Sequence, residues 1–201
     1  LLMILGNFAS NMAKPIIWIC SLYPLGWLVW AAFSDNLGAN PIEFTNRYLG
    51  ETALKILFFS LSITPIRIIT GWRSIVRVRR LLGLFAFFYV ILHFGFYISI
   101  EHFFNWHDIW QDIVKRNYIT FGFIAFIVLV PLAITSTKSM IKRVGAVFWK
   151  RLHKLVYLSA LLATVHFFMM QKGVQLEPIY YLIFLLILYL VRAFDHLRRR
   201  A

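Results

Sequence analysis

Six apolar runs, each close to 20 residues long, limit what this chain of 201 residues can fold into. A helix rises about 1.5 Å per residue, so about 20 residues cross the hydrocarbon core of a bilayer. Open strands are excluded there because lipid cannot satisfy their backbone hydrogen bonds. The runs predict an all-α fold, a polytopic membrane helix bundle with six transmembrane helices at about 15–33, 50–69, 80–100, 117–134, 150–170 and 177–194.

The composition supports this prediction, because 61% of the residues are hydrophobic and only 14% are charged. A water-soluble domain has about 45–50% apolar and about 25% charged residues. We find no internal repeat or linker and expect one domain over 1–201, with 1–14 as an N-terminal tail and 195–201 as a basic tail. The start of the first run also resembles a signal peptide, but the five spans that follow favour an uncleaved span.

The charged residues predict the orientation in the membrane. Lysine and arginine concentrate in 66–80, in 135–154 and at the C-terminus, and Lys14 lies on the same side. Basic loops of membrane proteins stay in the cytoplasm, so both termini are expected there. This pattern also argues against nucleic acid as the partner of a chain with net charge +13. The opposite loops hold seven of the eight acidic residues: Asp35, Glu43, Glu51, Glu101, Asp108, Asp112 and Glu177.

Three histidines, His93, His153 and His166, lie inside predicted spans. An ionisable residue within a membrane is costly and commonly functional. Imidazole ligates haem iron, zinc and copper. The single cysteine, Cys20, excludes iron–sulfur clusters and cysteine-ligated zinc. Because the acidic residues lie at the outer ends of the spans, a buried zinc site is less favoured than haem b.

Counting along the spans places His93 and His166 at one depth. At about 1.5 Å per residue they lie about 20 Å and about 24 Å from the cytoplasmic ends of their helices. They could therefore ligate one haem iron in the outer half of the membrane. His153 lies about 20 Å below His166 and could hold a second haem, although on an ideal helix it faces about 140° away. Arg79 stands at the depth of His153, where it could pair with a haem propionate, face the iron or simply mark the cytoplasmic side.

Two other interpretations use the same histidines differently. In a transporter or channel they would form a proton relay. Such proteins show internal repeats or paired broken helices, and the only hint here is Pro65 and Pro131 near span ends. In a scaffold subunit without a cofactor they would form hydrogen bonds between helices.

The sequence around these residues resembles the YedZ/MsrQ family, within the ferric-reductase-like transmembrane superfamily. The resemblance covers about residues 24–190, and it rests on several short stretches taken together. These are Gly50–Lys55, Ser62–Arg67, Arg79–Leu84, Tyr89, Leu92–His93, Lys115–Gly122, Leu132–Ser136, Gly145, Trp149–His153, Tyr157 and His166.

The resemblance implies a haem b electron-transfer subunit of the bacterial inner membrane, with one haem or two, rather than a catalytic subunit. Such proteins pass electrons, thought to come from the quinone pool, to a periplasmic molybdopterin-containing methionine sulfoxide reductase that repairs oxidised proteins. The family is also described as binding FMN, for which the chain shows no motif. His93, His153 and His166 match haem-associated positions, whereas Arg79 stands where the wider superfamily has a fourth histidine.

Two further expectations concern how electrons enter and leave. The chain shows no glycine-rich nucleotide-binding fold, so they are expected from a quinol, a flavin or a separate reductase rather than directly from a nicotinamide. An outer loop is either a docking surface for the partner or an ordinary solvated loop; its charged residues are Glu101, Asp108, Asp112, Lys115 and Arg116.

Overall fold

A computed structural model describes residues 2–171 and 176–199, with side chains described from Lys14 onward. All regular secondary structure in these residues is helical, and they contain no strand, which confirms the all-α prediction. Within this part of the chain, six segments are long and apolar enough to cross a membrane. They are Lys14–Phe33, Pro41–Thr70, Ser74–Glu101, Asn117–Ile134, Ala146–Met170 and Glu177–Arg198, and they confirm the six predicted spans.

Several helices extend beyond the predicted spans. Helix α1 (Leu2–Phe33) takes in, from Leu2, the segment expected as an N-terminal tail. Helix α9 (Glu177–Arg198) continues into the basic tail, of which Arg200 and Ala201 lie outside the described residues.

Helix α2 (Pro41–Thr70) begins at Pro41 rather than near residue 50. Proline suits the first turn of a helix, and the Asn40 side chain accepts a hydrogen bond from the Glu43 N–H at 3.3 Å. Glu51 then pairs with Arg47 at 3.2 Å and with Lys55 at 3.3 Å, both one helical turn away. Local hydrogen bonds and ion pairs therefore start this helix before its apolar run begins.

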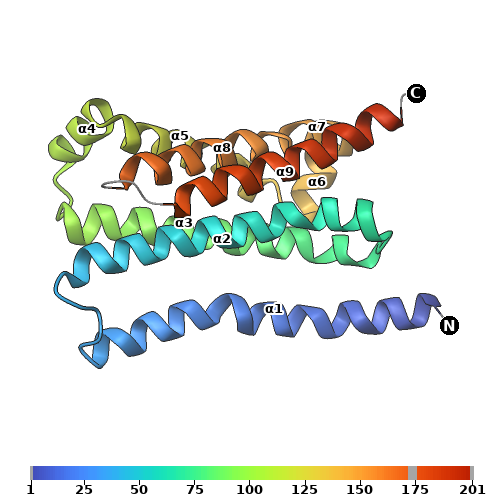
Figure 1. The fold of residues 1–201 in the computed structure, drawn as a ribbon, viewed down its shortest axis with the longest axis horizontal. Helices are drawn as coiled ribbons and strands as arrows, with labels where there is room; N and C mark the ends of the chain where they lie inside the picture. The colour runs from blue at the N-terminus through green and yellow to red at the C-terminus, as the bar shows by residue number, and fades with distance from the viewer. Residues whose placement is uncertain (1, 172–175, 200–201) are drawn as a thin grey trace. The chain divides into compact units, whose positions relative to one another are not determined.

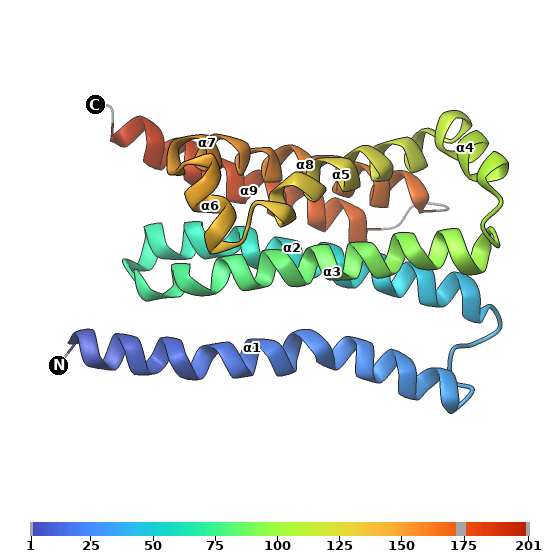
Figure 2. The same ribbon diagram turned by 180° about the vertical axis from the view of Figure 1, so that it is seen from behind.

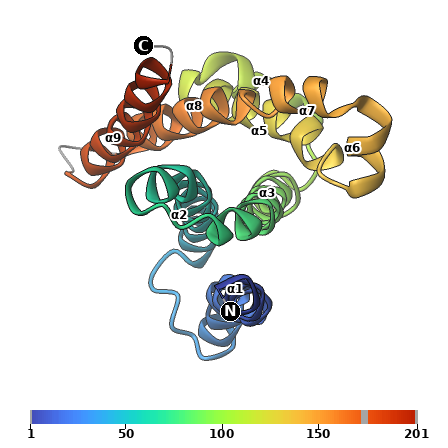
Figure 3. The ribbon, with the colours of Figure 1, turned by 90° about the vertical axis from the view of Figure 1, so that its right-hand side faces the viewer.

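The chain divides into two compact units, residues 1–86 with 186–201 and residues 87–185, which are described separately. In the first unit, α1 and α2 both contact the 3₁₀ helix η1 (Ser74–Val78). Figure 3 shows α1 and α2 viewed end-on. Aromatic pairs join α1 to its neighbours, because Trp18 lies 4.8 Å from Phe85 and Trp27 lies 5.0 Å from Tyr48, between ring centroids. The predicted single domain stays a prediction.

The second unit is built on α5 (Asn117–Ile134) and α8 (Leu155–Met170), which lie side by side along their length (Figures 1 and 2). Small side chains allow this close approach. Ser159 is fully buried, and its hydroxyl donates a 3.0 Å hydrogen bond to the Ala125 carbonyl. Helix α3 (Arg79–Phe96) joins this unit through Phe94, whose ring centroid lies 4.8 Å from that of Phe126.

Shorter helices connect the long ones in the second unit. A π-helical segment η2 (Tyr97–Glu101) ends the third span, and α4 (Trp106–Lys115) lies in the loop that follows. Helices α6 (Lys138–Val144) and α7 (Ala146–Leu152) connect α5 to α8 (Figure 2). The fifth span is therefore broken at a turn between α7 and α8.

The spans leave much of their apolar surface on the outside of the protein. Ile127, Leu158 and Leu186 are 45–58% exposed although each lies in the middle of a span. Exposed apolar side chains of this density need a lipid solvent, as the composition predicts.

Candidate metal centre

The structure brings the imidazole rings of His93 and His166 together. His93 lies on α3 and His166 on α8, and their ring centroids are 6.3 Å apart with an angle of 64° between the planes. An imidazole nitrogen lies about 2 Å from a first-row metal ion, which puts the centres of two opposed axial imidazoles about 6 Å apart. The spacing therefore fits two axial ligands of one iron.

His166 is anchored from behind. Its Nδ1 lies 2.6 Å from the Tyr118 carbonyl oxygen, at the first turn of α5. A carbonyl only accepts, so Nδ1 carries the proton and donates it, and Nε2 keeps the lone pair that binds a metal. Metal-ligating histidines commonly hold their second nitrogen in this way.

Gly122 provides the room for the His166 ring. A Cβ added at Gly122 would lie 2.9 Å from Nδ1 and 3.1 Å from Cγ of His166. A Cβ contact shorter than 3.0 Å essentially never occurs in proteins, so a larger residue at position 122 would force the ring or its surroundings to shift. Gly122 lies one turn after Tyr118 on α5. The same face of α5 therefore provides the carbonyl that binds the His166 ring and the space that the ring occupies.

Tyr118 is itself held at its other end. Arg116 donates a hydrogen bond to the Tyr118 hydroxyl at 3.4 Å and pairs with Asp112 of α4 at 3.1 Å. The hydrogen bond to Tyr118, and then the Asp112 carboxylate, raise the pKa of Arg116 above its usual value. The guanidinium thus stays charged while it ties the start of α5 to α4.

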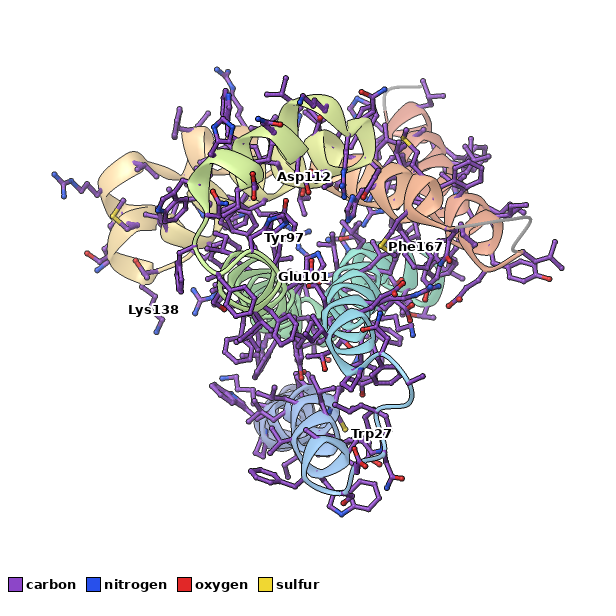
Figure 4. The ribbon with its side chains drawn as sticks, turned by 90° about the vertical axis from the view of Figure 1, so that its left-hand side faces the viewer. Trp27, Tyr97, Glu101, Asp112, Lys138 and Phe167 are labelled. Atoms are coloured by element: carbon purple, nitrogen blue, oxygen red, sulfur yellow. The ribbon has the colours of Figure 1, made fainter. Side chains whose placement is uncertain are left out.

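Asp112 is the centre of a small polar cluster. Besides Arg116 it lies 3.5 Å from His102 Nε2 and accepts a 3.4 Å hydrogen bond from the Tyr97 hydroxyl. Tyr97 of η2 and Asp112 of α4 lie side by side in Figure 4. The Asp112 side chain is only 17% exposed, so its contacts are mainly inside this loop rather than on the expected docking surface.

His153 lies at the break between α7 and α8 rather than within a continuous helix. Its Nε2 is 3.2 Å from the Thr135 hydroxyl, and its ring centroid is 4.1 Å from that of Trp149. The Trp149 Nε1–H donates to the Thr135 carbonyl at 3.0 Å. The angle of about 140° between His153 and His166 assumed an unbroken helix, so it does not apply here.

Arg79 belongs to the first unit, where it is bound to α2. Its Nη1 donates to the Thr64 hydroxyl at 3.2 Å, and its carbonyl accepts a 3.0 Å hydrogen bond from the Ser60 hydroxyl. These contacts hold the start of α3 against α2, and the predicted contact of Arg79 with haem stays a prediction.

The ligand set distinguishes haem from a bare metal ion. In the part of the chain that the structure describes, no three His, Cys, Asp or Glu side chains gather to hold a metal. Zinc sites use three or four protein ligands, whereas haem iron needs only axial ligands from the protein. Two imidazoles at this spacing, one of them with its Nδ1 bonded to a carbonyl, therefore fit haem better than a bare metal ion.

The fold and this histidine pair define a multi-pass helical membrane protein with a candidate intramembrane metal centre. The family of the ferric reductase like transmembrane component matches residues 49–164. The chain is 43% identical to the protein-methionine-sulfoxide reductase heme-binding subunit MsrQ of Herminiimonas arsenicoxydans, over 95% of this chain and 88% of that protein. It is 46% identical to MsrQ of Rhodospirillum rubrum, over 95% of this chain and 92% of that protein.

A longer protein contains the same module. The chain is 41% identical to the magnetosome protein MamZ of Magnetospirillum gryphiswaldense over 84% of this chain but only 27% of that protein. Of the two MsrQ proteins named above, by comparison, the match covers 88% and 92% of the length. The chain therefore belongs to the MsrQ family of bacterial multi-pass membrane proteins, within the ferric reductase like transmembrane group.

Proposed function

We propose that this chain is a haem b electron-transfer subunit whose axial ligands are His93 and His166. The observation that carries the proposal is the 6.3 Å separation of the two imidazole rings. Membership of the ferric reductase like family makes the chain a membrane redox subunit. The names of the two MsrQ relatives, which describe a heme-binding subunit of a methionine sulfoxide reductase, support the same cofactor and system.

The protein's own contribution to this function is to hold and insulate the site. Bound haem would supply reversible one-electron chemistry. The Tyr118 carbonyl orients His166 and increases the basicity of its Nε2, and Gly122 admits the ring. The aromatic rings of Phe94, Phe123 and Phe126 pack between α3 and α5, where they exclude water.

The wider pathway is also part of the proposal. Electrons come from membrane quinol or a flavin donor, with FMN implied by the family alone, and go to a periplasmic molybdopterin-containing methionine sulfoxide reductase. The exposed charges of the outer loop, Asp108, Lys115 and Arg116, are the proposed docking groups. Support for the partner comes from the relatives' names.

His153 remains the candidate ligand for a second haem. Arg79 remains a candidate contact to a haem propionate, as the sequence suggests. Ligation through Nε2 would replace the Thr135 hydroxyl that now lies 3.2 Å away. The haem count per chain decides between this role and a purely structural one.

The test is a reduced-minus-oxidised optical spectrum of the purified protein with a pyridine haemochromogen count. The α band of haem b is expected in the wild type and in His107→Ala, a control in the outer loop. In His93→Ala and in His166→Ala the haem count should fall by one, and the band should be lost if the wild type holds a single haem. A folded but colourless wild type from haem-supplemented cells would disprove the proposal and favour a proton-relay transporter.

The same haem count shows whether a second haem is bound. A value of two that falls to one in His153→Ala would assign His153 as a ligand. A count of one that His153→Ala leaves unchanged would assign it to the junction of α7 and α8.

A further inference from the structure

Helix α4 carries an apolar face that the described protein covers only in part. Ile109 and Ile113 are 4% and 8% exposed, and α4 contacts α5. Trp106, Trp110 and Val114, at a spacing of four residues, are 65%, 64% and 59% exposed. At about 100° per residue these five side chains form one arc of about 140°, of which the tryptophans and the valine make up the outer part.

The remaining surface of α4 is polar and hydrogen-bonded. Gln111 lies 2.6 Å from His107 and accepts a 2.7 Å hydrogen bond from Lys115, so these three side chains form a line along the helix. Asp108 accepts a hydrogen bond from Asn105 at 2.6 Å at the start of the helix. The helix is thus amphipathic, and its apolar arc is wider than the protein interior requires.

Two phenylalanines in the turn before α4 extend the exposed apolar face. Phe103 and Phe104 have φ angles of +47° and +59°, which bulky residues rarely adopt, and they are 78% and 58% exposed. The turn is held by the hydrogen bond from the Phe104 N–H to the Ile98 carbonyl at 2.9 Å. The Phe104 ring centroid is 6.4 Å from that of Trp106, so the exposed rings of the turn adjoin those at the start of α4.

The position of α4 identifies what covers these exposed side chains. The helix joins the end of the span Ser74–Glu101 to the start of the span Asn117–Ile134, so it lies where two spans leave the membrane on the same side. Tryptophan and other aromatic residues concentrate at the membrane–water boundary. A contiguous exposed group of large apolar side chains marks an interaction surface.

We propose that the aromatic face of α4, defined as Phe103, Phe104, Trp106, Trp110 and Val114, lies in the headgroup region of the bilayer. Helix α4 then runs along the membrane surface and turns its polar line, His107–Gln111–Lys115, toward water. Through Asp112 and Arg116 the same helix is tied to the start of α5. This inference does not depend on haem binding.

The experiment measures the depth of single nitroxide labels in the full-length protein. Cys20→Ser removes the only cysteine. The protein is placed without a partner in nanodiscs of phosphatidylethanolamine and phosphatidylglycerol. Collision of each label with oxygen, which concentrates in lipid, is compared with collision with a water-soluble nickel chelate. Cysteines replace, one at a time, Trp106, Trp110 and Val114 on the aromatic face and His107, Gln111 and Lys115 as controls one residue further on.

Labels at the aromatic positions should collide several-fold more with oxygen, relative to the chelate, than labels at the control positions. Equal chelate access at all six positions would overturn the proposal. So would protection of the aromatic positions that appears only after a periplasmic partner is added, because the face would then bind protein. Size-exclusion elution checks the fold of each variant.

A second readout uses the native tryptophans. Lipids brominated near the headgroup should quench the fluorescence of the unlabelled protein, and the Trp106→Phe/Trp110→Phe variant should lose part of that quenching. Identical fractional quenching in both proteins would contradict the proposal without any cysteine variant.

Discussion

At the scale of single residues, Gly122 is the most sensitive position of the candidate site. Gly122→Ala places a methyl group 2.9 Å from His166 Nδ1, so that something must shift, and we expect the ring to move away and its hydrogen bond to Tyr118 to weaken. Loss of such a supporting contact lowers metal affinity about 10–100-fold. We therefore expect haem affinity to fall at least about tenfold, measured by titrating haem into the apoprotein.

Gly26→Ala is the matched control, because a Cβ at Gly26 in α1 meets nothing within 4 Å. Both changes increase helix propensity by about the same amount, about 1 kcal/mol. Only the change at Gly122 should alter haem binding. Wild-type haem affinity in Gly122→Ala would show that His166 does not hold the iron in this orientation.

The residues of this site differ in how far the sequence predicts them. His93 and His166 could be paired in advance because helical rise alone fixes their depth. The contact of His166 with the Tyr118 carbonyl could not be predicted, because every residue has a carbonyl and the two positions lie 48 residues apart in the chain. Gly122 stands in one of the stretches that carry the family resemblance, but its role depends on how closely α5 and α8 approach.

At the scale of elements, Arg192 of α9 binds a backbone carbonyl of α2 that Pro65 leaves without its helical partner. Proline has no N–H, so Pro65 leaves the Leu61 carbonyl, one turn earlier, without its helical hydrogen bond. Arg192 Nη2 donates to that carbonyl, and its Nη1 donates to the Leu188 carbonyl at 3.1 Å. An unsatisfied carbonyl inside a membrane is costly, so the arginine stabilises a proline within a span.

A double-mutant cycle tests this link. Arg192→Met should lower the free energy of unfolding by about 1.5–3 kcal/mol in the wild type. The loss should be smaller in Pro65→Ala, because the N–H of residue 65 then satisfies Leu61. Unfolding by SDS in mixed micelles measures the free energy of unfolding in both backgrounds. Arg199→Met, at an exposed arginine paired with Asp195, is the control and should change little. Equal losses from Arg192→Met in both backgrounds would contradict the role of Leu61.

Elements were predictable where hydropathy alone decides them. The six spans follow from long apolar runs, but α4 was missed because it is short and alternates apolar with polar residues. The signal was present in Asn105, which caps the helix by accepting from the Asp108 N–H. The break between α7 and α8 has no glycine or proline at 153–154, and the contacts of His153 and Trp149 with Thr135 that surround it join distant positions.

At the scale of the whole molecule, the distribution of charge predicts which side of the membrane each loop occupies. An even number of spans puts the two ends of the described chain on the same side. Basic residues cluster in 66–80, in 135–154 and after Arg192, and acidic residues in the opposite loops. The positive-inside rule then predicts cytoplasmic termini and a periplasmic α4.

Cysteine labelling tests this orientation. In a Cys20→Ser background, Ser34→Cys lies in the exposed loop after α1, and Ser139→Cys lies on the exposed surface of α6. A maleimide that cannot cross the inner membrane should label Ser34→Cys in intact cells and Ser139→Cys only after lysis. The two sites serve as controls for each other, since both are exposed serines next to a helix end. The reverse pattern would place α4, with any partner docked on it, in the cytoplasm, and electron delivery to a periplasmic reductase would then be excluded.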